Sequence, residues 1–209
     1  KIVYSFDEAT GTLYLSGVGP MNDIVNYYGG GSKTQWWFDY KQSIKNVVIA
    51  DGITYIGKYA FTQCKNLEYV ELPANSILIG NAAFEECVGL KSIYVRGNDP
   101  IVGHIDLSTV PELNSWTFSK CYLIANATIN EEVYDIGSSV FDSCVNLSGV
   151  YGTVGSYAEE FAKKNNLLRT CGTDYHFVEK TFHGGIYVPR DCETAADIAR
   201  WICENGKIK

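Results

Sequence analysis

The 209-residue sequence lacks the features of several large protein classes. No apolar run is long enough to cross a membrane, so we expect no membrane span in this chain. Its 17 basic residues form no basic run and are outnumbered by 24 acidic residues, which argues against nucleic acid as a partner. The 7 cysteines are too few for a disulfide scaffold, and the odd number leaves at least one thiol unpaired in a monomer.

The signatures of catalysis and metal binding are also missing. The sequence has no Cys-x-x-Cys pair, no phosphate-binding glycine loop and no Gly-x-Ser-x-Gly nucleophile motif. A zinc site built from Cys171, His176, His183 and Cys192 would have spacings that fit no common pattern. We therefore predict no catalytic residues, no metal site, no cofactor and no enzymatic activity.

What the sequence does contain is an internal repeat. Phe61 and Phe84 are 23 residues apart, and the other shared positions of their two segments keep the same offset. A third copy surrounds Phe141, and a degenerate copy around Phe118 carries about 11 extra residues within residues 96–112. The three clear copies, at residues 56–73, 79–95 and 136–151, read IGKYAFTQCKNLEYVELP, IGNAAFEECVGLKSIYV and IGSSVFDSCVNLSGVY.

Each copy reads as a short strand and a turn. Val70 and Leu72 share one face of a strand that Pro73 ends, because proline has no N–H to donate. Gly57 permits a bend, after which residues 59–64 form a short turn or helix that delivers Ala60, Phe61 and Cys64 inward. One such unit does not bury its apolar face alone, whereas stacked copies share a core. We expect about five parallel strands, ~4.8 Å apart.

The pattern I-G-x-x-A-F-x-x-C-x-x-L-x-x-V-x-L-P resembles the BspA-type leucine-rich repeat over residues 44–151. The opening YSFDEATGTLYLSGVGPM is similar to the segment that precedes such repeats in surface proteins of gut bacteria. The resemblance implies the α/β class and a right-handed solenoid of short parallel strands with short helices or turns. It also implies a secreted or cell-surface protein that acts in adhesion and has no catalytic residues.

Four regions follow from these patterns. Residues 1–43 are predicted to form an N-terminal cap with a β-hairpin, and residues 44–152 hold the repeats. A capping box from Ser156 to Glu159 begins a helical cap in residues 153–170. Residues 171–209 form a small tail of unknown type, read as two strands and a helix. Trp36, Trp37, Phe38 and Tyr40 either close the first coil or form a platform for carbohydrate.

The cysteines fall into two groups. Cys64, Cys87, Cys121 and Cys144 occupy one repeat column and are predicted to be buried, unpaired thiols. Whether Cys171, Cys192 and Cys203 pair with one another stays open.

A binding surface is predicted on the open face of the repeat sheet. One outward column is Val48, Glu71, Tyr94, Thr128 and Tyr151, and the next is Asn46, Tyr69, Ser92, Asn126 and Gly149. Because tyrosine offers a large contact area with few rotatable bonds, we expect Tyr69, Tyr94 and Tyr151, with Glu71, to bind a host or cell-surface protein or glycan. The inserted loop with Pro100 and His104 is the other candidate. The alternative function is a structural spacer within a longer surface protein.

Overall fold

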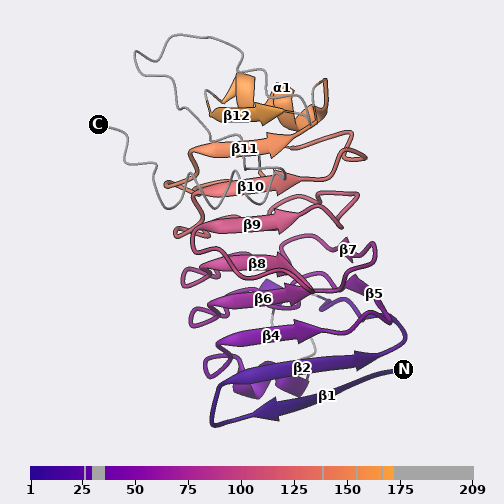
Figure 1. Cartoon of the computed structure of the whole chain (residues 1–209). Helices are drawn as coiled ribbons and strands as arrows, with labels where there is room; N and C mark the ends of the chain where they lie inside the picture. The colour runs from indigo at the N-terminus through magenta and orange to yellow at the C-terminus, as the bar shows by residue number, and fades with distance from the viewer. Residues whose placement is uncertain (26, 30–35, 138, 154, 166, 172–209) are drawn as a thin grey trace.

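The computed structural model describes residues 1–25, 27–29, 36–137, 139–153, 155–165 and 167–171. The chain winds into coils that stack along one axis, and each coil contributes a strand to a nine-stranded sheet (Figure 1). The first pair is antiparallel and the other neighbours are parallel. In spatial order the strands are β1 (Ile2–Asp7), β2 (Thr12–Gly17), β4 (Asn46–Ile49), β6 (Tyr69–Leu72), β8 (Ser92–Val95), β9 (His104–Leu107), β10 (Asn126–Ile129), β11 (Gly149–Gly152) and β12 (Leu168–Cys171).

The strand register repeats from coil to coil, which confirms the predicted solenoid. Side chains alternate across a strand, so one column faces the core in every repeat. That column is buried from β4 to β11 and runs Val47, Val70, Ile93, Ile105, Ala127 and Val150. The predicted hairpin is present as β1 and β2, and β2 extends the sheet by pairing with β4.

The far side of each coil is made of short extended pieces and turns. A three-stranded sheet joins β3 (Gly19–Pro20), β5 (Ile53–Ile56) and β7 (Leu78–Ile79). The next segment is a turn rather than a helix, because two positions in the repeat adopt positive φ, as at Tyr59 and Gln63. Alternate N–H groups there donate to the following coil, for example from Phe61 to the carbonyl of Ala83.

A row of stacked aromatic rings fills the core. Phe61, Phe84, Phe118 and Phe141 stack with centroid separations of 5.3 to 5.8 Å. Trp37 extends the row at the first coil, 5.8 Å from Phe61, and donates its indole N–H to the carbonyl of Ala60. Trp37 belongs to the 3₁₀-helix Trp36–Tyr40; a shorter one spans Tyr27–Gly29. Trp37 is buried, which supports the cap rather than the carbohydrate platform.

The column of Cys64, Cys87, Cys121 and Cys144 consists of buried free thiols, as predicted. Each thiol from Cys87 onward donates to the carbonyl of a phenylalanine one coil earlier, such as Cys87 to Phe61 at 3.1 Å. Burial raises the pKa of the Cys64 thiol to about 12, so the neutral, apolar form packs in the core.

At the last coil, helix α1 (Tyr157–Lys164) begins at the predicted capping box. Ser156 accepts from the N–H of Glu159 at 3.5 Å, and the Glu159 carboxylate accepts from the N–H of Gly155 at 2.8 Å. Ala158 and Ala162 face the core, whereas Tyr157 is largely exposed. The edge strand β12 follows and was not predicted. The expected tail elements, with Cys192 and Cys203, lie outside the described residues.

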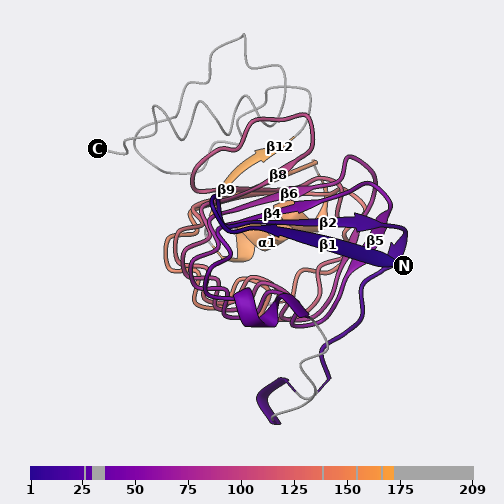
Figure 2. The ribbon, with the colours of Figure 1, turned by 90° about the horizontal axis from the view of Figure 1, so that it is seen from below.

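The insertion in the degenerate repeat forms an extra strand, β9, and an unusual connection. Residues 96–103 link β8 to β9 across the open face of the sheet, opposite the core side where the other coils turn (Figure 2). Since β9 still lies next to β8 in parallel orientation, this crossover has the opposite hand to the others and is left-handed. About 98% of such crossovers are right-handed.

Candidate functional site: a tyrosine-lined groove

Four adjacent strands present two outward rows of side chains on the open face. The first row, in register, is Tyr14, Val48, Glu71 and Tyr94. The second row is Thr12, Asn46, Tyr69 and Ser92. Because strand pairing fixes the backbone at these positions, the Cβ atoms of the two rows form a regular grid.

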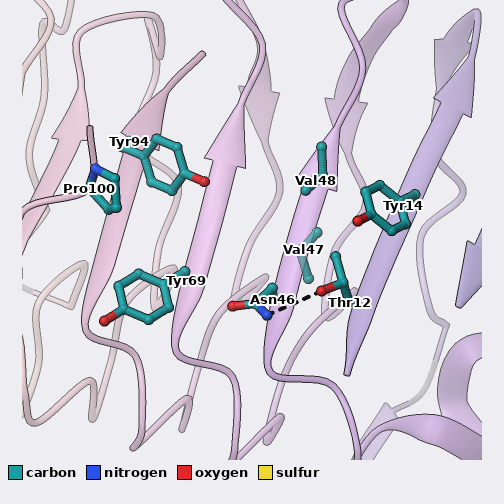
Figure 3. Close-up of a pocket in the computed structure, with 8 residues that line it drawn as sticks. All are labelled: Thr12, Tyr14, Asn46, Val47, Val48, Tyr69, Tyr94 and Pro100. Carbon is teal, nitrogen blue, oxygen red and sulfur yellow. Dashed lines mark hydrogen bonds between the residues drawn. The ribbon is translucent and has the colours of Figure 1, made fainter. Parts of the chain in front are cut away.

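A groove of about 340 Å³ lies over this grid (Figure 3). Tyr14 contributes a ring that is 44% exposed at one end, and the partly exposed rings of Tyr69 and Tyr94 lie toward the other end. Pro100, from the left-handed crossover, lines the same groove and stands beside the Tyr94 ring. The complete lining is Thr12, Tyr14, Asn46, Val47, Val48, Tyr69, Tyr94 and Pro100.

Polar groups in the groove are amides and hydroxyls. The amide nitrogen of Asn46 donates to the hydroxyl of Thr12 at 3.2 Å, which orients both side chains at the floor (Figure 3). Beside them, Val48 supplies an apolar part of the floor. Among the described residues that line the groove, none carries a charge. The surface therefore combines flat aromatic faces with neutral hydrogen-bonding groups.

Charged residues flank the groove in closed pairs. The Arg96 guanidinium lies 2.8 Å from Glu71 and 3.1 Å from Asp51, and it donates to the carbonyl of Ile49 at 2.8 Å. On the other side, Lys91 lies 2.7 Å from Glu68. The three contacts of Arg96 hold this first residue of the crossover against the sheet, because its planar guanidinium binds three groups at once.

Of the predicted site residues, Tyr69 and Tyr94 meet in the groove, whereas Glu71 is engaged elsewhere. The Glu71 carboxylate binds Arg96 and accepts from the Tyr94 hydroxyl at 3.4 Å. Burial, and then the charge of Glu71, raises the pKa of Tyr94, so this phenol stays protonated at neutral pH. Glu71 thus positions Tyr94 and Arg96 beside the groove.

Tyr151 is not an exposed member of this surface, which corrects the prediction. It is only 1% exposed and lies on β11, three strands beyond β8. Its hydroxyl donates to the side-chain oxygen of Asn126 at 2.9 Å. The ring folds back over Gly149, where an added Cβ would lie 2.9 Å from the Tyr151 hydroxyl and 2.5 Å from the Asn126 oxygen. The missing side chain at Gly149 leaves room for the Tyr151 phenol on the same, open face of the sheet.

Tyr14 and Thr12 were not predicted as binding residues, because the hairpin was interpreted only as a cap. One signal was present: Leu13 and Leu15 alternate as Val47 and Ile49 do, and the structure pairs these residues in register. Pro100 was named within the inserted loop, but its position over the sheet was not predicted.

Next to the groove, the open face continues into a buried polar patch around His104. Its Nε2 lies 3.2 Å from the hydroxyl of Thr128, and burial lowers the pKa of the imidazole to about 4. Among the described residues, no group of three or more His, Cys, Asp or Glu side chains is placed to hold a metal ion.

Comparisons with known proteins agree with this architecture. The family described as the BspA type leucine rich repeat region matches residues 34–157 in 6 copies. No curated protein matches the sequence. Within the described residues, every helix is too short or too polar to span a membrane.

The comparison with solved structures found three similar chains. A leucine-rich repeat protein from Eubacterium ventriosum is 22% identical with a TM-score of 0.54; the match covers 71% of this chain and 41% of that one. The T. pallidum leucine-rich repeat protein is 20% identical, with a TM-score of 0.46 and coverage of 72% and 68%. A leucine rich cell surface protein from Faecalibacterium prausnitzii is 21% identical, with a TM-score of 0.42 and coverage of 70% and 40%.

Proposed function

This chain belongs to the BspA-type leucine-rich repeat family, and we propose that it is a non-enzymatic binding module whose groove binds a protein or glycan outside the cell. The observation that carries the proposal is the groove itself, where Tyr14, Tyr69 and Tyr94 surround a neutral floor. The family resemblance supports a secreted or surface-attached location. We further propose that residues 1–43 and 153–170 act as caps for the repeats in residues 44–152.

Physical chemistry favours binding at this face over a purely architectural role. A parallel sheet is normally covered on both faces, yet here partly exposed aromatic side chains gather on the outer one. Tyrosine is enriched at interfaces because it buries a large ring while its hydroxyl still forms hydrogen bonds. The strand grid also holds the rings in place before binding, which reduces the entropy lost on association.

Surface plasmon resonance tests the proposal with the intact chain and a panel of matrix proteins and surface glycans. We expect saturable binding to at least one of them at micromolar concentration. The double variant Tyr69→Ala/Tyr94→Ala should weaken that binding about tenfold or more without a large loss of Tm. Tyr134→Ala is the matched control, because Tyr134 is 67% exposed and lies outside the groove. Binding that the double variant leaves unchanged would exclude the groove, and no saturable binding at all would favour a structural spacer.

A further inference from the structure

We propose that the groove takes an uncharged oligosaccharide, an inference that rests on the proposed binding function and names its ligand class. Three features of the groove carry it: the described lining residues are uncharged, aromatic faces are spread over several strands, and the groove lies on the face rather than at the edge of the sheet.

The electrostatics of the groove favour a neutral ligand. In the part of the chain that the structure describes, the side chains lining the groove carry no charge. Glu71, in the outward row between Val48 and Tyr94, is paired with Arg96, and Lys91 is paired with Glu68. An ionic ligand would lose hydration on entering and find no opposite charge there to compensate. A neutral ligand loses less.

The arrangement of the rings suits a short chain of sugar units. Tyr14 and Tyr94 lie in one row on strands three steps apart, so their backbones are about 14 Å apart at ~4.8 Å per step. A pyranose ring has an apolar C–H face and a rim of hydroxyls. The C–H face can pack on a tyrosine ring, while the Asn46 amide and the tyrosine hydroxyls lie where rim hydroxyls would form hydrogen bonds.

A position on the sheet face is less suitable for an extended peptide. The N–H and C=O groups of β4, β6 and β8 are engaged in strand pairing, so they do not satisfy a peptide laid across them. Peptide amides over Val48 and the ring faces would lose water, and the few polar side chains of the groove would pair with only some of them. A proline-rich peptide avoids part of this loss because proline has no N–H, and tyrosine-lined grooves can bind such segments. It is therefore the informative competitor.

Calorimetric titration of the intact chain tests the inference. The probes are cello-, manno- and maltotetraose and N-acetylated chitotetraose, with oligogalacturonate as an acidic sugar and decaproline as the peptide. We expect at least one neutral tetrasaccharide to bind with a Kd of about 1 mM or tighter. Oligogalacturonate should bind no more tightly than that sugar.

Matched variants locate the binding. Tyr69→Ala and Tyr94→Ala should each weaken saccharide affinity about fivefold or more, whereas Tyr94→Phe, which keeps the ring, should retain most of it. Tyr134→Ala should leave the affinity unchanged. If Tyr69→Ala and Tyr94→Ala leave the saccharide affinity unchanged, the inference is wrong.

The remaining outcomes separate this inference from the proposed function. If no neutral saccharide binds, or decaproline alone binds and depends on Tyr69 and Tyr94, the oligosaccharide inference is wrong. A groove-dependent interaction with a peptide or matrix protein would still uphold the proposed function. If the groove variants changed the binding of no probe, both the oligosaccharide inference and the proposed function would be wrong.

Discussion

Phe61 and Phe84 lie 23 residues apart in sequence and stack with their ring centroids 5.3 Å apart and their planes 14° from parallel. The same contact recurs between Phe84 and Phe118 at 5.8 Å, so Phe84 has an aromatic neighbour on both sides. All three side chains are fully buried. The interior of the solenoid thus holds a continuous stack of rings from successive coils.

Replacing the ring in the middle of this stack should be costly. We expect Phe84→Ala to lower the free energy of unfolding by about 3–5 kcal/mol, because it removes a buried ring and leaves a cavity between two others. Phe84→Leu should cost less because it fills part of that space. Guanidinium unfolding followed by tyrosine and tryptophan fluorescence measures both, with exposed Tyr134→Ala as the control. A loss under 1 kcal/mol for Phe84→Ala would contradict the shared-core interpretation.

The core was predictable from the sequence because successive coils place the same residue types at the same core positions. The recurrence of Phe61, Cys64 and Val70 at a fixed offset therefore specified the stacking, the strand register and the buried thiols. The hand of the β8–β9 connection and the position of Pro100 followed no such period. Tyr151 differed in a local way that no period specifies: its phenol lies over Gly149, which has no side chain, and donates to the Asn126 oxygen.

The turns contain backbone strain that substitution can relieve. Ser143 is exposed and adopts a φ of 58°, a region that costs an L-residue about 1–2 kcal/mol. Ser143→Gly should stabilise the fold by about 0.5–1 kcal/mol, because glycine removes this strain but loses more backbone entropy on folding. Ser143→Val should destabilise it.

A matched position checks that interpretation. Lys65 is also exposed in a turn but has no positive φ, so Lys65→Gly should destabilise the fold by about 0.5–1 kcal/mol. Thermal and urea unfolding of the three variants give the signs. Equal effects of glycine at positions 65 and 143 would show that the left-handed turn stores no strain.

The left-handed crossover should depend on Arg96. Arg96→Lys keeps the positive charge but not the planar group that reaches Glu71, Asp51 and the carbonyl of Ile49 together. We expect faster hydrogen exchange at the amides of Asn98 and Gly103, which donate to the carbonyls of Val95 and Lys91. The free energy of unfolding should fall by about 1 kcal/mol. Lys120→Ala, which breaks an ion pair with Glu86 on another part of the coil, should leave both amides unchanged. Unaltered exchange in Arg96→Lys would mean that the crossover is held by its backbone alone.

His104 should make the fold sensitive to mild acid. Burial lowers the pKa of its imidazole from the usual 6.5 to about 4, and the opposing attraction of Asp106 is smaller. In the unfolded chain the His104 imidazole is therefore protonated below about pH 6.5, whereas in the folded chain it stays neutral down to about pH 4. Above pH 6.5, protonation of His104 takes nothing from the free energy of unfolding. As the pH falls from 6.5 to about 4, up to about 3 kcal/mol of that free energy is lost.

The variant His104→Gln isolates this effect, because it keeps a neutral polar group beside Thr128 but does not titrate. Urea unfolding at pH 7 and at pH 4.5 should show a larger loss of stability in the natural sequence than in His104→Gln. Carboxylates with lowered pKa values, such as Asp23 and Glu86, are common to both proteins and cancel in the comparison. Parallel pH profiles would mean that the imidazole can be protonated within the folded structure without penalty. The polar patch around Thr128 would then have to admit water or a compensating charge, and the buried, neutral state of His104 would be wrong.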